Sequence, residues 1–255
     1  AVMRFSSNQS VIFGAAAVVP LYFWVREITS HRVALICCLI YVLIPSIVLF
    51  SATCAEILFM PFLLVTLFLF DRALRRGGLG YALAAGVGYA VLSLLKFTLL
   101  GVGAYFALAG LWMLGKRGHR RNVFQTAALM MAGFLALHLM VRWWTGFDMV
   151  ACFWTAKAHF DLDQHHLDQI TPRLPGWTYR LINPVTWFYF AGIPVSVLGL
   201  WRWRRPAADG TTGLFLVILG TLIALDLFYL GRGEGERSAL YVFPFMAVPA
   251  ARSEE

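Results

Sequence analysis

Long apolar stretches alternate along the chain with short polar gaps. Nine stretches are candidate membrane-spanning helices: 11–25, 33–50, 57–70, 79–95, 97–114, 123–140, 185–200, 212–230 and 239–251. A helix needs roughly 20 apolar residues to cross the hydrocarbon core, so several of them are short. Only Lys96 separates the fourth stretch from the fifth, and we predict a tight re-entry there. The pattern predicts an all-α, polytopic transmembrane helix bundle of about nine spans, forming a single domain over residues 1–255.

Basic residues gather in alternate gaps. These gaps hold Arg26 and Arg32; Arg72, Arg75 and Arg76; Lys116, Arg117, Arg120 and Arg121; and Arg202, Arg204 and Arg205. Because cytoplasmic loops carry an excess of Lys and Arg, we assign these gaps to the cytoplasm. The other gaps carry most of the acids and are expected outside: 51–56, Lys96, 142–184 and 231–238.

The composition agrees with lipid as the solvent. Hydrophobic residues make up 60% of the chain and charged residues 13%, about half the charged share of a soluble domain. The net charge of +8 is concentrated in the predicted cytoplasmic gaps, which leaves no basic soluble face for nucleic acid. The four cysteines form no CxxC motif and no disulfide framework, so we expect reduced, buried thiols.

The gap at 142–184 is the largest predicted outer loop, and loops of that length are usually functional. Its aromatic residues are Trp143, Trp144, Phe153, Trp154, Trp177 and Tyr179. They suit short amphipathic helices lying in the headgroup layer, and they would also suit stacking against a sugar.

The same loop contains a cluster of imidazoles and carboxylates. His159 and Asp163 are four residues apart, as are Asp161 and His165, so each pair would share a face of a helix. Such ligands could bind a divalent metal, the one cofactor that the sequence suggests. The spacing matches no specific metal motif, and a hydrated polar loop is the alternative.

Three charged residues stand at the edges of the apolar stretches. Glu56 is either a solvated helix N-terminus or a base or metal ligand facing an outer cavity. Lys96, which has no acidic neighbour in sequence, either snorkels outward or presents its ammonium to a lipid phosphate. Asp226 lies inside the eighth stretch, four residues before its outer end.

Glycines alternate with charges in the last outer gap, 231–238. Glycine permits close backbone approach to a ligand, and Arg232 and Arg237 could fork onto a phosphate. The alternative is an ordinary charged turn. The segment is not a Walker loop, because GxxxxGK[ST] is absent.

Four stretches together resemble the dolichyl-phosphate-mannose protein mannosyltransferases, a GT-C class of polytopic membrane glycosyltransferases. They are 21–51; 86–98, which holds a glycine-containing span ending in Lys96; 183–194; and Glu236-Arg237 followed by Pro244. The resemblance implies transfer of a sugar from a polyprenyl-phosphate donor to a glycan, lipid or protein acceptor by inverting displacement at the non-cytoplasmic face of a bacterial-type cell membrane. It assigns Glu56 as the base, and Lys96, Arg232, Glu236 and Arg237 to substrate and carrier-phosphate binding.

One departure from the family pattern concerns the principal acid, which relatives carry in a first outer loop after an N-terminal span. We expect this chain to lack both, and to be catalytically incomplete alone. A multi-pass transporter that uses Glu56, Lys96 and Asp226 along a substrate path is the runner-up, although no internal repeat is evident. A non-catalytic membrane scaffold is the third alternative.

Overall fold

The computed structural model describes residues 10–53, 55–116, 118–170, 176–203, 212–228 and 240–252. Within these ranges every regular element is a helix, as predicted. After a helical turn region at 10–16, the elements are α2 (Val18–Ile28), α3 (His31–Leu43), α4 (Pro45–Thr53), η1 (Ala55–Phe59), α5 (Met60–Arg76), α6 (Leu79–Leu95), η2 (Phe97–Val102), α7 (Gly103–Leu114), α8 (Arg120–Thr145), α9 (Met149–Ile170), α10 (Gly176–Ala191), α11 (Ile193–Trp203), α12 (Thr212–Phe228), η3 (Leu240–Val242) and α14 (Phe243–Arg252).

Four helices of the described ranges are long and apolar enough to cross a membrane: Ser10–Ile28, Glu56–Arg76, Phe97–Leu114 and Arg120–Thr145. The pair Leu181–Ala191 and Ile193–Trp201, bent by 110°, makes a fifth if it is one span. Four further apolar helices are shorter, and His31–Leu43 is only about 20 Å long at 1.5 Å per residue. Each predicted stretch therefore overlaps a helix, but the structure supports four or five full spans and not nine.

Local sequence explains where several helices begin and end. Ser30 caps α3 by accepting a hydrogen bond from the Val33 N–H at 3.3 Å. Ile44, which precedes a proline, is extended and separates α3 from α4. Gly77 ends α5 with a φ of 79°, a conformation that favours glycine. The break predicted at Lys96 is confirmed, because this residue is extended between α6 and η2.

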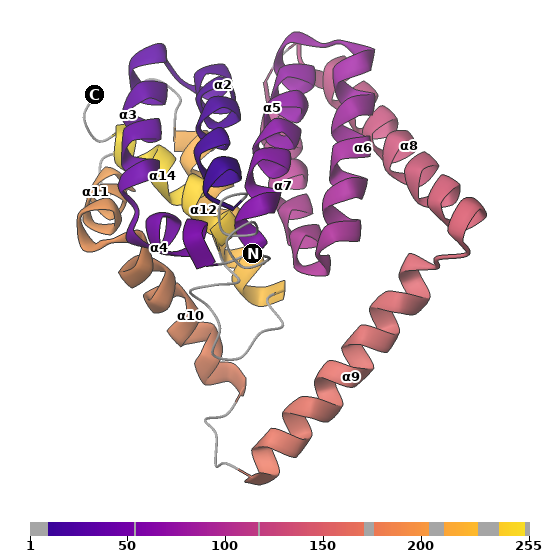
Figure 1. Ribbon diagram of the computed structural model, residues 1–255. Coiled ribbons are helices and arrows are strands. Elements are labelled where there is room, and N and C mark those ends of the chain that lie inside the picture. The colour runs from indigo at the N-terminus through magenta and orange to yellow at the C-terminus, as the bar shows by residue number, and fades with distance from the viewer. Residues whose placement is uncertain are drawn as a thin grey trace.

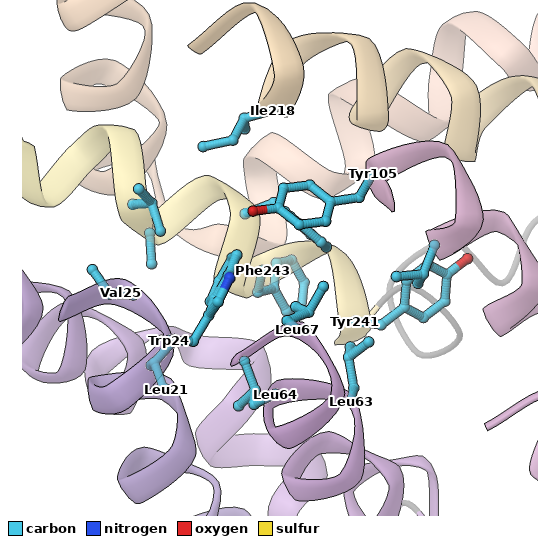
Figure 2. Close-up of a cluster of buried hydrophobic side chains, with 14 of the residues drawn as sticks. Leu21, Trp24, Val25, Leu63, Leu64, Leu67, Tyr105, Ile218, Tyr241 and Phe243 are labelled. Carbon is cyan, nitrogen blue, oxygen red and sulfur yellow. The ribbon is translucent and has the colours of Figure 1, made fainter. Parts of the chain in front are cut away.

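The core lies where α2, α5, α7 and α14 meet (Figures 1 and 2). Trp24 packs edge-on against Tyr105 and Phe245, with ring centroids 6.0 and 5.4 Å apart. All ten residues of α14 are buried, although this helix is short. The C-terminal helix is thus a central element around which the first helices pack.

Helices α6 and α8 approach each other through glycines. A Cβ on Gly86 would overlap the backbone carbonyl of Met130, and a Cβ on Gly133 would stand 2.6 Å from the Leu83 carbonyl oxygen. Small residues at such crossings let helix backbones come together in a membrane protein. Glycine at these two positions therefore sets the distance between α6 and α8.

Much of the predicted outer loop is helical. Helix α8 continues to Thr145, Gly146 ends it with a φ of 72°, and α9 then runs for 22 residues. In Figure 1, α9 extends away from the rest of the bundle, and most of its described side chains are exposed. This is one long helix instead of several short ones, and its interfacial position stays a prediction.

Candidate functional site

Glu56, predicted as the base, and Lys96, predicted to bind the carrier phosphate, lie together in the structure. The Lys96 Nζ is 3.4 Å from the Glu56 Oε1, and each side chain keeps only about a fifth of its surface exposed, 21% and 23% respectively. Lys96, which has no acidic neighbour in sequence, therefore has one in the fold. The partner is 40 positions away in sequence and reaches Lys96 only because α6 packs against α5.

Backbone breaks place both side chains. Glu56 lies in the first turn of η1, the 3₁₀ turn that leads into α5. Lys96 is the single extended residue between α6 and η2, and its N–H still donates to the Leu92 carbonyl. Two interruptions of apolar helices thus bring an ammonium and a carboxylate to the same end of the bundle.

The pair lines a small recess of about 10 Å³, which has room for about one water molecule. The other lining residues are Tyr241, whose ring carries a hydroxyl, and the apolar Phe59, Met60, Leu63, Leu99 and Leu240. Leu240 and Tyr241 belong to η3, where the described chain resumes after residue 239. A partly desolvated ion pair in an apolar wall is a stronger electrostatic feature than an exposed one.

The remaining predicted substrate and phosphate ligands, Arg232, Glu236 and Arg237, lie outside the described residues. On α9, the structure does not describe the side chains of Asp163 and His165. His159 is exposed on α9, and Asp161 accepts from the Lys157 Nζ at 2.7 Å. No group of three metal-ligating side chains occurs in the part of the chain that the structure describes, so the metal site stays a prediction.

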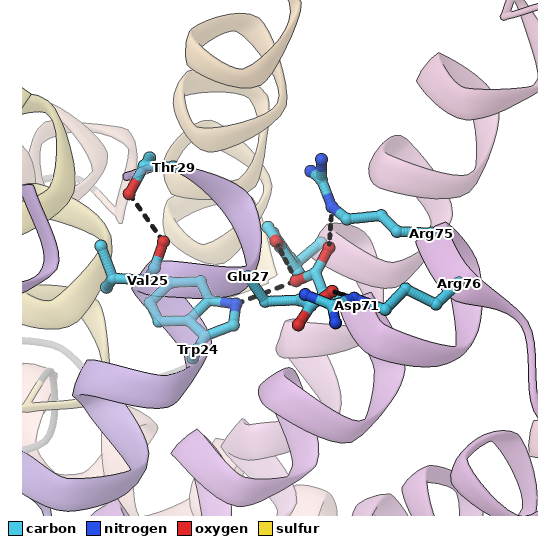
Figure 3. A network of polar contacts seen from close by, with 8 residues as sticks. Trp24, Val25, Glu27, Thr29, Asp71, Arg75 and Arg76 are labelled. Carbon is cyan, nitrogen blue, oxygen red and sulfur yellow. Dashed lines mark hydrogen bonds and ion pairs between the residues drawn. The ribbon is translucent and has the colours of Figure 1, made fainter. Parts of the chain in front are cut away.

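A buried polar network at the opposite end of α5 was missed by the sequence analysis (Figure 3). The fully buried Asp71 accepts hydrogen bonds from the Trp24 indole at 2.9 Å and the Tyr105 hydroxyl at 2.6 Å, and Arg75 lies 3.6 Å away. The signal in the sequence was an acid four residues before an arginine, at the edge of a gap that we assigned to the cytoplasm by its basic residues. The network joins α2, α5 and α7, and its role is structural.

A second pair that sequence reasoning missed lies one turn before Lys96. The buried Ser93 hydroxyl is 3.0 Å from the His138 Nε2 and also donates to the Ala90 carbonyl. The pair links α6 to α8 near the same end of the bundle as Glu56. No sequence motif marks it, because the two residues are 45 positions apart.

Comparison with known families agrees with the resemblance seen in the sequence. The model of a family described as dolichyl-phosphate-mannose-protein mannosyltransferase matches residues 6–144, more than half of the chain and the part that holds Glu56 and Lys96. Searches of curated proteins and of solved structures gave no match. The match gives no support to the transporter alternative. With its long apolar helices and this match, the chain is an integral membrane protein that belongs to the dolichyl-phosphate-mannose-protein mannosyltransferase family of glycosyltransferases.

Proposed function

We propose that this protein transfers a sugar from a polyprenyl-phosphate donor to an acceptor at the non-cytoplasmic face of the membrane, by a single inverting displacement. The observation that carries the proposal is the Glu56–Lys96 pair, an acid and a cation 3.4 Å apart within the matched family region. Such a transfer needs one group to accept a proton and another to stabilise a departing phosphate.

In the proposed step the acceptor hydroxyl oxygen attacks the anomeric carbon of the donor. The bond from that carbon to the carrier phosphate breaks, and the electron pair leaves with the phosphate, beside the Lys96 ammonium. The hydroxyl proton passes to the Glu56 carboxylate. The balance needs no oxidant, reductant or further reactant.

The ion pair also suggests how the two groups are held before the donor arrives. In the apolar wall of the recess, each charge neutralises the other. A donor phosphate that binds Lys96 would compete with the Glu56 carboxylate and free it to act as a base. Arg237 lies three positions before Leu240, a residue of the recess wall. We therefore include Arg232 and Arg237 in the proposed phosphate site and Glu236 in the adjoining substrate site.

The side of the membrane that we propose for the reaction follows from the residues at the two ends of one spanning helix. The span Glu56–Arg76 has 21 residues and is about 30 Å long, the thickness of the hydrocarbon core. Glu56 lies at one end, while Arg72, Arg75 and Arg76 lie at the other. Because basic residues mark the cytoplasmic side, the Glu56–Lys96 pair is assigned to the opposite side.

The test uses the full-length protein in proteoliposomes with a radiolabelled polyprenyl-phosphate sugar and a host lipid and glycan extract as the acceptor source. Glu56→Gln should lower kcat by about 10²- to 10⁴-fold and leave the donor KM near that of the wild type. Lys96→Gln should raise the donor KM and lower kcat, because the Lys96 ammonium would contact the carrier phosphate both in the donor complex and in the transition state.

Lys157→Gln is the matched control, because it removes a lysine from the exposed ion pair with Asp161 on α9. It should retain wild-type turnover. The anomeric configuration of the product, read by NMR, tests inversion. Wild-type kcat in Glu56→Gln would overturn the role of this carboxylate, and a product with the donor's own configuration would overturn the single displacement.

A further inference from the structure

A cavity of about 520 Å³ among α5, α6, η2, α7 and α8 is not used by the proposed transfer. Its volume is within the roughly 300–1,000 Å³ of ligand sites. The lining is almost wholly apolar, and the Tyr89 hydroxyl on its wall already donates to the Leu100 carbonyl at 2.6 Å. Water would find few partners there, so the chemistry of the lining favours a hydrocarbon chain.

The cavity opens sideways between α7 and α8. Ala107 on α7 and Ala127 on α8 both line it and are both exposed. These helices are two of the four long enough to cross a membrane, so their exposed faces meet lipid. A lipid chain can therefore enter from the bilayer without passing through water.

One end of the cavity leads to a cluster of cations. Leu74, in its wall, adjoins Arg75, and the N–H of Val123, also in its wall, donates to the His119 carbonyl at 3.0 Å. The link between α7 and α8 and the first turn of α8 contribute three more described cations, Lys116, Arg120 and Arg121.

Among the residues that the structure describes, this cluster has an excess of positive charge. The chain contains no acid between Asp71 and Asp148. Among the described residues, no carboxylate forms an ion pair with Lys116, Arg120 or Arg121. The acids that the described residues place at this end, Glu27 and Asp71, are already engaged with Arg72, Arg75 and Arg76.

Lys116 shows the effect of this excess. Its Nζ lies 3.9 Å from the centroid of the Trp112 ring, and the Arg75 guanidinium lies 5.6 Å from the same ring. Burial and the nearby Arg75 lower the pKa of Lys116. A ligand that brought negative charge to this position would relieve that repulsion.

We infer that the protein binds an anionic glycerophospholipid, with one acyl chain in the cavity between α7 and α8 and the phosphate over Lys116, Arg120 and Arg121. Basic pockets between transmembrane helices bind anionic headgroups in this way. The cations proposed for the phosphate lie at the opposite end of the bundle from Glu56 and Lys96, whereas the cavity itself reaches Leu100 of η2; the headgroup position is therefore separate from the proposed transfer site. The bound lipid would tie α5, α7 and α8 together at the membrane surface.

The test is native mass spectrometry of the full-length protein in detergent, titrated with phosphatidylglycerol or with phosphatidylcholine of the same chains. Wild type should bind phosphatidylglycerol at least about tenfold more tightly. Arg120→Gln/Arg121→Gln changes two exposed residues and should weaken phosphatidylglycerol binding by roughly 10- to 30-fold, with phosphatidylcholine binding unchanged. Arg32→Gln, an exposed arginine on α3, is the control and should bind as wild type.

A second pair of variants tests the cavity. Ala127→Trp should fill it and weaken both lipids by roughly tenfold, the equivalent of about two buried CH₂ groups. Ala128→Trp, next to it on the exposed surface of α8 and outside the lining, should have no effect. Equal binding of the two lipids by wild type would overturn the inference, as would unchanged binding in Ala127→Trp. Displacement of the bound lipid by polyprenyl phosphate, with Arg120→Gln/Arg121→Gln behaving as wild type, would assign the cavity to the donor's tail instead.

Discussion

The substitution Gly86→Ala tests the close approach of α6 and α8. The new Cβ would stand 2.8 and 2.9 Å from the carbonyl carbon and Cα of Met130 and would overlap the carbonyl oxygen. Ordinary carbon contacts begin near 3.4 Å, so the two helices would have to separate by about 0.5 Å or more. The obstacle is backbone, which cannot rotate away as a side chain can.

The magnitude follows from two opposing terms. Overpacking in a dense interior costs about 1–3 kcal/mol, and a backbone obstacle places this site at the upper end. Alanine in place of glycine within a helix returns about 1 kcal/mol. The net loss of about 2 kcal/mol corresponds to a Tm lower by about 4–8 °C for a chain of this size.

The assay is thermal unfolding of the purified protein in detergent, followed by the loss of monodisperse protein with temperature. Gly80→Ala is the matched control, because it lies on the same helix with nothing within 4 Å of the added Cβ. It should raise Tm slightly or leave it unchanged. If Gly86→Ala and Gly80→Ala melted within about 1 °C of each other, the reasoning from the helix crossing would be refuted.

Two further predictions concern acids at the ends of helices. Asp71→Ala would leave the buried Trp24 indole and Tyr105 hydroxyl without their acceptor and should cost about 3–5 kcal/mol, seen as a sharp loss of folded protein on purification; wild-type yield and Tm would contradict it. Asp148→Ala should speed hydrogen exchange in the first turn of α9 several-fold, while Asp148→Asn should not, because Asp148 Oδ1 accepts from the Val150 and Ala151 N–H groups at 3.0 and 3.1 Å. Those hydrogen bonds, chiefly that of Ala151, and the nearby Arg142 hold the pKa of Asp148 below its usual value. The contribution of the ionised carboxylate to the cap is therefore present at neutral pH and lost as pH falls through that lowered pKa. The protonated carboxyl keeps an acceptor oxygen, so exchange in the first turn of α9 below that pKa should approach that of Asp148→Asn and stay slower than that of Asp148→Ala.

Properties that depend on nearby residues could be predicted from the sequence. Whether a segment is apolar enough for lipid depends on that segment alone, so the helical membrane fold was predictable, as was the break at Lys96. The distribution of Arg and Lys predicted a common side for the gaps at 26–32, 72–76 and 116–121; in the structure Arg72 and Arg76 pair with Glu27, and Arg75 and Lys116 lie against the same Trp112 ring. The family resemblance was also carried by short local stretches, and the family match agrees with it.

The lengths of the helices were harder to predict. Hydropathy does not distinguish a full span from a half-length buried helix, so the stretches 33–50 and 239–251 were counted as spans, where the structure has the shorter helices His31–Leu43 and Leu240–Arg252. In the structure, α14 is buried by its neighbours on every side and reaches only part of the way across. The polar composition of 149–170 was taken for a loop, although a helix with exposed side chains accommodates it equally well.

Tertiary structure alone decided which distant residues meet. The Glu56–Lys96 pair joins positions 40 apart, and the Asp71 network draws its partners from α2 and α7. The need for glycine on α6 and α8 is evident only where the two helices cross, because an added methyl group there would overlap a backbone carbonyl of the other helix. The apolar composition of a helix determines whether lipid or water surrounds it. Around α6 and α8, however, apolar residues are spread nearly evenly. The choice of neighbours therefore depends on shape and on the few buried charges, which only the packed structure brings together.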